Sequence, residues 1–272
     1  MTDNAPIVVG VDGSGGSFDA VRWAARAAEL RGTSLHLVST YQDRNVYTTL
    51  AAIPAEQLGK LQQAARSTLD AASEIARGAV RNPETLSTSC EGALGSTVSV
   101  LLDHAVTARM LVVGSRGNNE YFAELLGSVS AGVTARAHCP VVVVQGQVTA
   151  ERAAGPVVVG VDGSRQNRGA VGVAFDEASV RGARLVAVHA GDGAVLAESL
   201  AGWQEQFPDV AVERALVRDD VVDEIVRVSI TAQAVVVGTR CHGFSGVLPR
   251  STSRTLAHRI DCPLIVVGHV AD

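Results

Sequence analysis

Short apolar runs alternate along the first half of the chain with longer segments in which apolar residues recur every three or four positions. Five runs rich in Val, Leu and Ile cover residues 6–12, 34–40, 85–90, 110–114 and 140–145. Such runs are typical of strands that are buried on both faces of a sheet. Between them, residues 21–30 and 58–76 carry a single apolar stripe at helical spacing. The alternation of five strands with helices predicts an α/β fold built of parallel βαβ units.

The second half of the chain repeats the first. Three pairs of sequence blocks recur in the same order, namely PIVVGVDGS at 6–14 with PVVVGVDGS at 156–164, LVVGSR at 111–116 with VVVGTR at 235–240, and CPVVVV at 139–144 with CPLIVV at 262–267. The helix predicted at 58–76 is nearly lost in the second copy, where only a short stretch near 196–207 replaces it. Residues 147–155 carry no apolar periodicity and predict a linker. We therefore expect two tandem domains, residues 1–147 and 155–272.

Composition narrows the classes of function. The 272 residues are 47% apolar and 19% charged with a net charge of −5, which fits a globular chain and not a basic nucleic-acid module. The only lysine, Lys60, is followed by Leu61, so the G-x-x-x-x-G-K-[ST] phosphate loop is absent. No apolar run approaches the length of a membrane span. We expect neither nucleic acid nor membrane as a partner.

The four cysteines indicate a reducing compartment. None of them forms a C-x-x-C pair, and the first residues lack the basic and apolar pattern of a signal peptide. Cys139 and Cys262 each precede a proline and an apolar run, which predicts small buried side chains at the entrance of a strand. The expected location is the cytoplasm.

Two polar loops carry the candidate chemistry. Asp12, Gly13 and Ser14 follow the first strand, and residues 114–117 (GSRG) follow the fourth. In open parallel sheets, ligands bind outside the carboxyl ends of the strands. Further on, Gly127 and Ser128 stand where the next helix begins, and free N–H groups at such a position bind phosphate. The competing interpretation is a helix cap at Ser14 and an ordinary turn after the fourth strand.

Together these residues resemble the universal stress protein family in its tandem two-domain form. The spacing G-x2-G-x9-G-[ST] is met by Gly114, Gly117, Gly127 and Ser128, and VVGVDGS stands at the start of each half. The resemblance covers nearly the whole chain. It implies two doubly wound, five-stranded parallel sheets with helices on both faces, a Rossmann-like fold of the adenine nucleotide alpha hydrolase type. It also implies that the two copies pair as an internal pseudo-dimer through residues 140–145 and 263–268. A homodimer is a further possibility that the family allows.

The resemblance also implies a site for ATP in the first copy, where Mg²⁺ would accompany the triphosphate. Asp12 would contact the adenosine part, the backbone around Thr40 would recognise adenine, and the glycine motif would hold the phosphates. The residues that the family pattern assigns to this site are Gly10, Asp12, Thr40, Gly114, Ser115, Arg116, Gly117, Gly127, Ser128, Val129 and Ser130.

The second copy departs from this pattern. Two of the three glycines are gone, because the matching residues are Cys241 and Arg250, and the spacing is one residue shorter. Arg250 could bind an anion or fill the pocket. We expect weaker or absent binding there. The matching positions are Gly160, Asp162, Ala190, Gly238, Thr239, Arg240, Ser251, Thr252 and Ser253.

Other activities fit the residues less well. The segment SGGSFD at 14–19 is a near miss to the S-G-G-x-D-[ST] loop of adenylating pyrophosphatases, and no G-x-G-x-x-G opens either half for a flavin or NAD. The histidines show no metal-ligand spacing, so we expect no metal site. No general base or catalytic residue is identifiable. The expected function is that of an ATP-binding regulator in a stress or dormancy response, working through an unknown protein partner, with ATP hydrolysis slow or absent. A scaffold that binds no nucleotide is the alternative.

Overall fold

The computed structural model describes residues 5–41, 54–115, 127–146, 150–218, 220–239 and 252–268, and these form two compact units. The first unit contains β1 to β4 and α1 to α4, and the second contains β5 to β10 and α5 to α9. The boundary falls at the end of α4, between Val133 and Thr134. The division of the sequence repeat into 1–147 and 155–272 stays a prediction.

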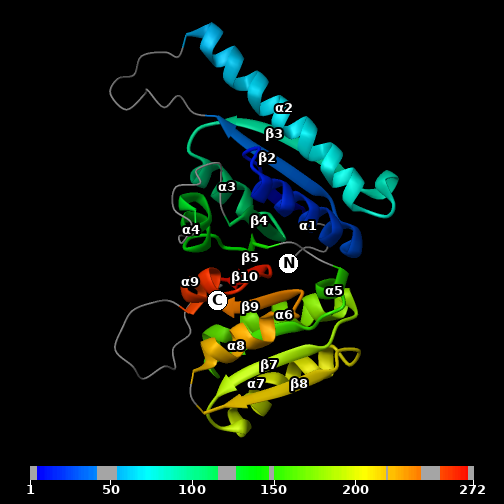
Figure 1. Ribbon diagram of the computed structural model, residues 1–272, viewed down its shortest axis with the longest axis vertical. Coiled ribbons are helices and arrows are strands. Elements are labelled where there is room, and N and C mark those ends of the chain that lie inside the picture. The colour runs from blue at the N-terminus through cyan, green and yellow to red at the C-terminus, as the bar shows by residue number, and fades with distance from the viewer. Residues whose placement is uncertain are drawn as a thin grey trace. The chain divides into compact units, whose positions relative to one another are not determined.

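The first unit has four parallel strands in the order β3-β2-β1-β4 (Figure 1). The strands are β1 (Ile7–Gly10), β2 (Leu35–Tyr41), β3 (Thr88–Leu94) and β4 (Met110–Gly114). The helices are α1 (Gly15–Arg31), α2 (Ala55–Ala79), α3 (Thr97–Ala105) and α4 (Ser128–Thr134), and Pro83–Thr85 forms a 3₁₀ turn. Helices α1 and α2 pack against each other on one face of the sheet, while α3 packs on β1 and β2 from the other face. The predicted alternation of strands and helices is confirmed.

The second unit repeats this arrangement, but α6 and α7 are shorter than α1 and α2. Its strands are β5 (Val141–Val144), β6 (Val157–Val161), β7 (Leu185–Ala190), β8 (Val212–Val217), β9 (Ala234–Gly238) and β10 (Leu264–Val267). Its helices are α5 (Ala150–Ala153), α6 (Arg168–Arg181), α7 (Gly193–Gln206), α8 (Val221–Ser229) and α9 (Thr252–Arg259), with a 3₁₀ turn at Arg165–Asn167. The strands β10-β9-β6-β7-β8 are all parallel. The 14 residues of α7 replace the 25 residues of α2, as the sequence repeat predicts.

Strand β5 belongs to the first copy by sequence but to the second unit by its contacts. It pairs antiparallel with β10, and Val142 lies opposite Ile265. Every residue of both strands is buried. The expected pairing of residues 140–145 with 263–268 is therefore present. Because apolar side chains cover both strands, the hydrogen bonds between them are protected from water.

The third strand of the first copy differs from the sequence prediction. The run at 85–90 was expected to be buried on both faces, but the strand begins at Thr88, after the 3₁₀ turn that contains Pro83, and most of its residues are exposed. Both β3 and β8 stand at the edge of their sheets. An edge strand has a neighbour on one side only, so its residues lose burial that central strands have.

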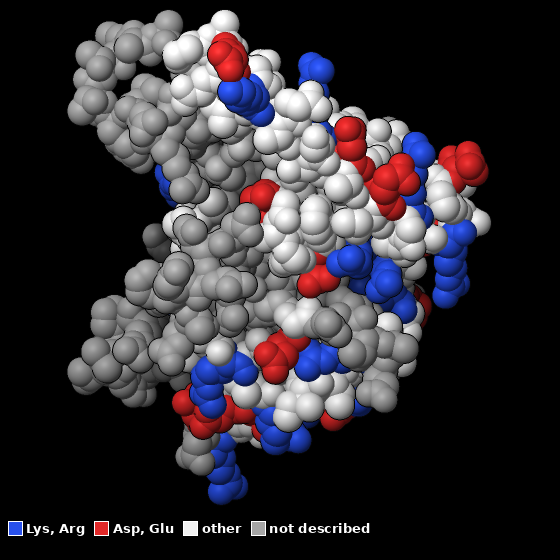
Figure 2. Space-filling view, turned by 45° about the horizontal axis from the view of Figure 1, so that its top comes forward, with Lys and Arg blue, Asp and Glu red and all other residues white. Residues whose placement is uncertain are grey.

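The expected burial of Cys139 and Cys262 is confirmed. Cys139 and Cys262 are buried just before β5 and β10. Cys90 is exposed, and Cys241 lies outside the described residues. Within the described part of the chain, no helix is both long and apolar enough to span a membrane. On the face drawn in Figure 2, basic and acidic side chains are interspersed.

Candidate functional site

The loop after β1 is organised by Asp12. Its Oδ1 accepts hydrogen bonds from the backbone N–H of Ser14 (2.9 Å) and from the Ser14 hydroxyl (2.6 Å). Gly13 has φ +83°, a conformation that favours glycine. The Ser14 Oγ in turn accepts from the N–H of Ser17 (3.2 Å) and caps α1. The helix-cap interpretation of Ser14 is thus correct, and it leaves the Asp12 side chain exposed at the end of the strand.

The end of β4 lies directly against the start of α1. A Cβ on Gly114 would lie 2.7 Å from the carbonyl carbon and oxygen of Gly16 and 3.0 Å from the nitrogen of Ser17. These are backbone atoms of the helix, which cannot move aside as a flexible side chain can. Gly114 is therefore required by packing. It brings the loops after β1 and β4 next to each other at the carboxyl ends of two paired strands.

The start of α4 is tied to the same place. The Ser130 hydroxyl donates to the carbonyl of Gly114 (2.7 Å), and the N–H of Gly127 donates to the carbonyl of Ser115 (3.0 Å). The structure thus brings Gly114, Ser115, Gly127 and Ser130 together. In these hydrogen bonds, the Gly127 amide and the Ser130 hydroxyl already donate to protein carbonyls, although the family pattern assigns both groups to phosphate. Ser128 is exposed and Val129 half-buried beside them.

Two other predicted positions frame this edge of the sheet. Thr40 is half-buried at the end of β2, and its Oγ1 lies 2.6 Å from the Oγ1 of Thr97 on α3. At the end of β1, a Cβ on Gly10 would meet the side chain of Leu101 at 2.9 Å. Thr97 was not foreseen, because a single threonine at a helix start carries no distinguishing signal. Arg116 and Gly117, two central positions of the glycine motif, lie outside the described residues.

In the second unit, Asn167 ties the corresponding loop together. Its Nδ2 donates to the carbonyl of Gly160 (3.2 Å), and its Oδ1 accepts from the N–H of Asp162 (3.4 Å). A Cβ on Gly238 would lie 3.5 Å from this Nδ2. The side chain thus lies between the ends of β6 and β9. Asn167 was not among the predicted site residues, although the repeat aligns it with Ser17 and so places an amide where the first copy has a hydroxyl.

The second copy nevertheless keeps the carboxylate arrangement. Oδ1 of Asp162 accepts from the N–H of Ser164 (2.8 Å), while its Oδ2 is buried and has no hydrogen-bond partner among the described residues. A buried carboxylate oxygen without a donor is costly, and ligands or water usually satisfy it. Beside it, Nδ1 of the buried His189 lies 2.8 Å from the carbonyl of Val161, next to Ala190.

The remaining predicted positions of the second copy lie after the end of β9 and at the start of α9. The N–H of Thr239 donates to the carbonyl of Val267 (3.0 Å), Thr252 begins α9, and Ser253 is buried. Arg240, Arg250 and Ser251 lie outside the described residues.

A groove in the second unit contains none of the predicted positions. It has a volume of about 450 Å³ and lies beside Gly163 and Ser164, between α6 and α7. Arg165 and Arg168 line it on one side and Trp203 on the other. The Trp203 ring also packs against Phe175 and Phe207 in the core.

Comparisons with known proteins agree with the fold. The model of the universal stress protein family matches residues 4–145. A universal stress protein of Mycobacterium tuberculosis is 37% identical over 282 residues, covering 96% of this chain and 95% of that protein. One of Mycolicibacterium smegmatis is 36% identical, with 96% of each covered. The crystal structure of a universal stress protein from Archaeoglobus fulgidus is similar in fold, with a TM-score of 0.77 at 19% identity over 98% of this chain and 99% of that one.

Proposed function

Because this chain belongs to the universal stress protein family, we propose that its first half binds ATP at the carboxyl ends of β1 and β4. One observation carries the proposal. The absence of a side chain at Gly114 lets the end of β4 touch the first turn of α1, so that the Asp12 loop and the start of α4 meet at one edge of the sheet. Ligands of open parallel sheets bind at such an edge.

The proposed roles follow from the hydrogen bonds that each group already makes. Asp12 has Oδ1 engaged within its loop, so we assign Oδ2 to a ribose hydroxyl or the adenine amino group. The backbone at Thr40 would lie beside the base. Since Gly127 N–H and Ser130 Oγ already donate to protein carbonyls, the phosphates would rely on Ser128, the neighbouring backbone, Arg116 and Gly117.

Mg²⁺ fits this site only as a companion of the triphosphate. Mg²⁺ requires about six oxygen ligands and keeps several waters. Among the described residues of the site, the carboxylate is that of Asp12, and one of its oxygens already accepts two hydrogen bonds. Phosphate oxygens and water would therefore supply most of the ligands.

We propose weaker binding in the second half. The Asn167 side chain bridges Gly160 and Asp162 and lies against Gly238, so the loop after β6 is closed on itself. The first half has Ser17 at this position, and its hydroxyl bonds locally to the carbonyl of Ser14. The free Oδ2 of Asp162 supports a residual affinity for a ligand that offers a hydroxyl or amino donor.

The proposed activity is regulation rather than catalysis. Hydrolysis of a phosphoanhydride needs a group that positions or deprotonates water beside the γ-phosphate. The described residues of the first site offer hydroxyls, backbone groups and one carboxylate that is held in a turn. We propose that a protein partner distinguishes the ATP-bound chain from the free chain.

The matched variants Asp12→Asn and Asp162→Asn test the assignment. Asparagine keeps the Oδ1 that orders each loop and removes the charge and one acceptor, so the fold should remain. We expect Asp12→Asn to weaken ATP binding by about ten-fold, the value of one charge-assisted hydrogen bond, and Asp162→Asn to leave the tighter affinity unchanged.

The measurement is calorimetric titration of the full chain with ATP, together with mass analysis of any nucleotide that copurifies, counted per chain. One nucleotide per chain is the expected count. Two nucleotides per chain would contradict the weaker second site. If no nucleotide copurified and titration showed no binding, the result would favour a scaffold.

A further inference from the structure

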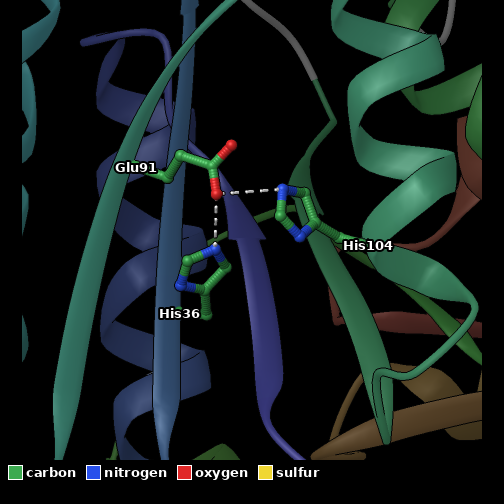
Figure 3. Close-up of side chains that lie close together, drawn as sticks. All are labelled: His36, Glu91 and His104. Carbon is green, nitrogen blue, oxygen red and sulfur yellow. Dashed lines mark ion pairs between the residues drawn. The ribbon is translucent and has the colours of Figure 1, made fainter.

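Two histidines and a glutamate converge on the face of the first sheet that α3 covers. His36 comes from β2, Glu91 from the edge strand β3 and His104 from the last turn of α3. Figure 3 shows both imidazole rings directed at the same carboxylate oxygen of Glu91. None of these residues belongs to the proposed nucleotide site. The residues are far apart in the sequence, which is why ligand spacing gave no sign of them.

The distances suit a common ligand. The Glu91 Oε2 lies 3.6 Å from Nε2 of His36 and 3.5 Å from Nε2 of His104. Ligand atoms about 2.1 Å from a tetrahedral metal ion lie about 3.4 Å from one another. The candidate ligand atoms of all three residues lie within 4.8 Å of one another. Small rotations of half-buried side chains would bring the two rings to the required separation.

A hydrogen bond behind the cluster prepares His36 as a ligand. Its Nδ1 lies 2.8 Å from the Ser89 hydroxyl, on the residue directly opposite in β3. When Nδ1 carries the proton and donates it there, Nε2 presents its lone pair toward Glu91. Histidine ligands of metals are commonly oriented in this way through their second nitrogen.

The surroundings also favour neutral imidazole. The two ring centroids are 4.9 Å apart, so two protonated rings would repel each other. Burial, with a further contribution from His104, lowers the pKa of His36 below its usual value, although Glu91 opposes the shift. Neutral imidazole is the form that binds metals.

We propose that His36, Glu91 and His104 bind one divalent transition-metal ion, with Zn²⁺ as the ion of choice. Two imidazoles and one carboxylate form a common zinc ligand set and leave a fourth position for water. The ion would link β2, the exposed edge strand β3 and α3. The expectation of no metal site, drawn from sequence spacing alone, is opposed by this geometry.

The test is Zn²⁺ binding to the untagged full chain, measured by competition with a chromophoric chelator. We expect one Zn²⁺ per chain with a micromolar or lower dissociation constant, and an upward shift of the melting temperature. His36→Gln, Glu91→Gln and His104→Gln should each weaken binding by at least about ten-fold. His258→Gln, on the exposed side of α9, is the matched control and should bind as the parent does.

Cobalt gives a second readout that does not depend on affinity alone. Co²⁺ should produce visible absorption of a four-coordinate site in the parent and in His258→Gln but not in the three ligand variants, whose folding is checked by circular dichroism. The proposal is overturned if the parent binds no stoichiometric Zn²⁺, or if folded ligand variants bind it as tightly as the parent.

Discussion

Gly114 shows how one residue can have a packing role and a functional position at once. The sequence motif assigns it to phosphate binding, whereas the structure gives it a contact with the backbone of α1. Both follow from the same missing side chain. The glycine pattern marks a position of close backbone approach, but it does not distinguish approach to a ligand from approach to a helix, because either requires a position without Cβ.

Gly114→Ala should therefore destabilise the protein even without ligand. Its Cβ would lie 2.7 Å from backbone atoms of Gly16, and overpacking of this kind costs about 1–3 kcal/mol of unfolding free energy. Gly59→Ala is the control, because nothing lies within 4 Å of the added Cβ within α2 and alanine favours a helix. Urea unfolding measures both. Equal stability of Gly114→Ala and the parent would contradict the packing role.

The buried thiol of Cys262 should make the free energy of unfolding fall at alkaline pH. Burial raises the pKa of its thiol from 9.0 to about 12. Between these values the unfolded chain releases the proton and the folded chain keeps it, so this contribution to stability is complete below pH 9 and is lost as pH rises toward 12.

We expect the unfolding free energy of the parent to fall faster above pH 9 than that of Cys262→Ala, by about 1.4 kcal/mol per pH unit. Guanidinium unfolding at several pH values, under reducing conditions, measures the difference. If the unfolding free energies of the parent and of Cys262→Ala fell in parallel with pH, the thiol would ionise equally well in the folded and the unfolded chain.

At the scale of elements, the starts of α1 and α6 show how local sequence changes a loop. Both follow the sequence Asp-Gly-Ser, and in both the serine accepts from an N–H three residues on. In the first copy, Gly15 and Gly16 follow this serine and α1 begins directly at Gly15. In the second copy, residues 165–167 follow it and form a 3₁₀ turn before α6. The shared cap was predictable from sequence. The bridge made by Asn167 was not, because its partners lie across the loop.

Ser14→Ala should remove the cap of α1 and one of the hydrogen bonds to Asp12. We expect a loss of about 1 kcal/mol of unfolding free energy and weaker ATP binding, because the Asp12 loop loses order. Ser67→Ala, at an exposed position within α2, is the control and should be neutral or slightly stabilising. Chemical unfolding and ATP titration check the two effects. If Ser14→Ala had the unfolding free energy and the ATP affinity of the parent, the role proposed for the cap would be wrong.

For the whole molecule, the sequence alone determined the repeated α/β units and the parallel strands. Apolar period and recurring blocks reveal these features because burial on a sheet imposes its period on the chain. Tertiary structure decided which separated residues meet. His36, Glu91 and His104 come from three elements, and Asn167 reaches from the start of a helix to the end of a strand. Strand order and register bring such side chains together, and no local pattern encodes them.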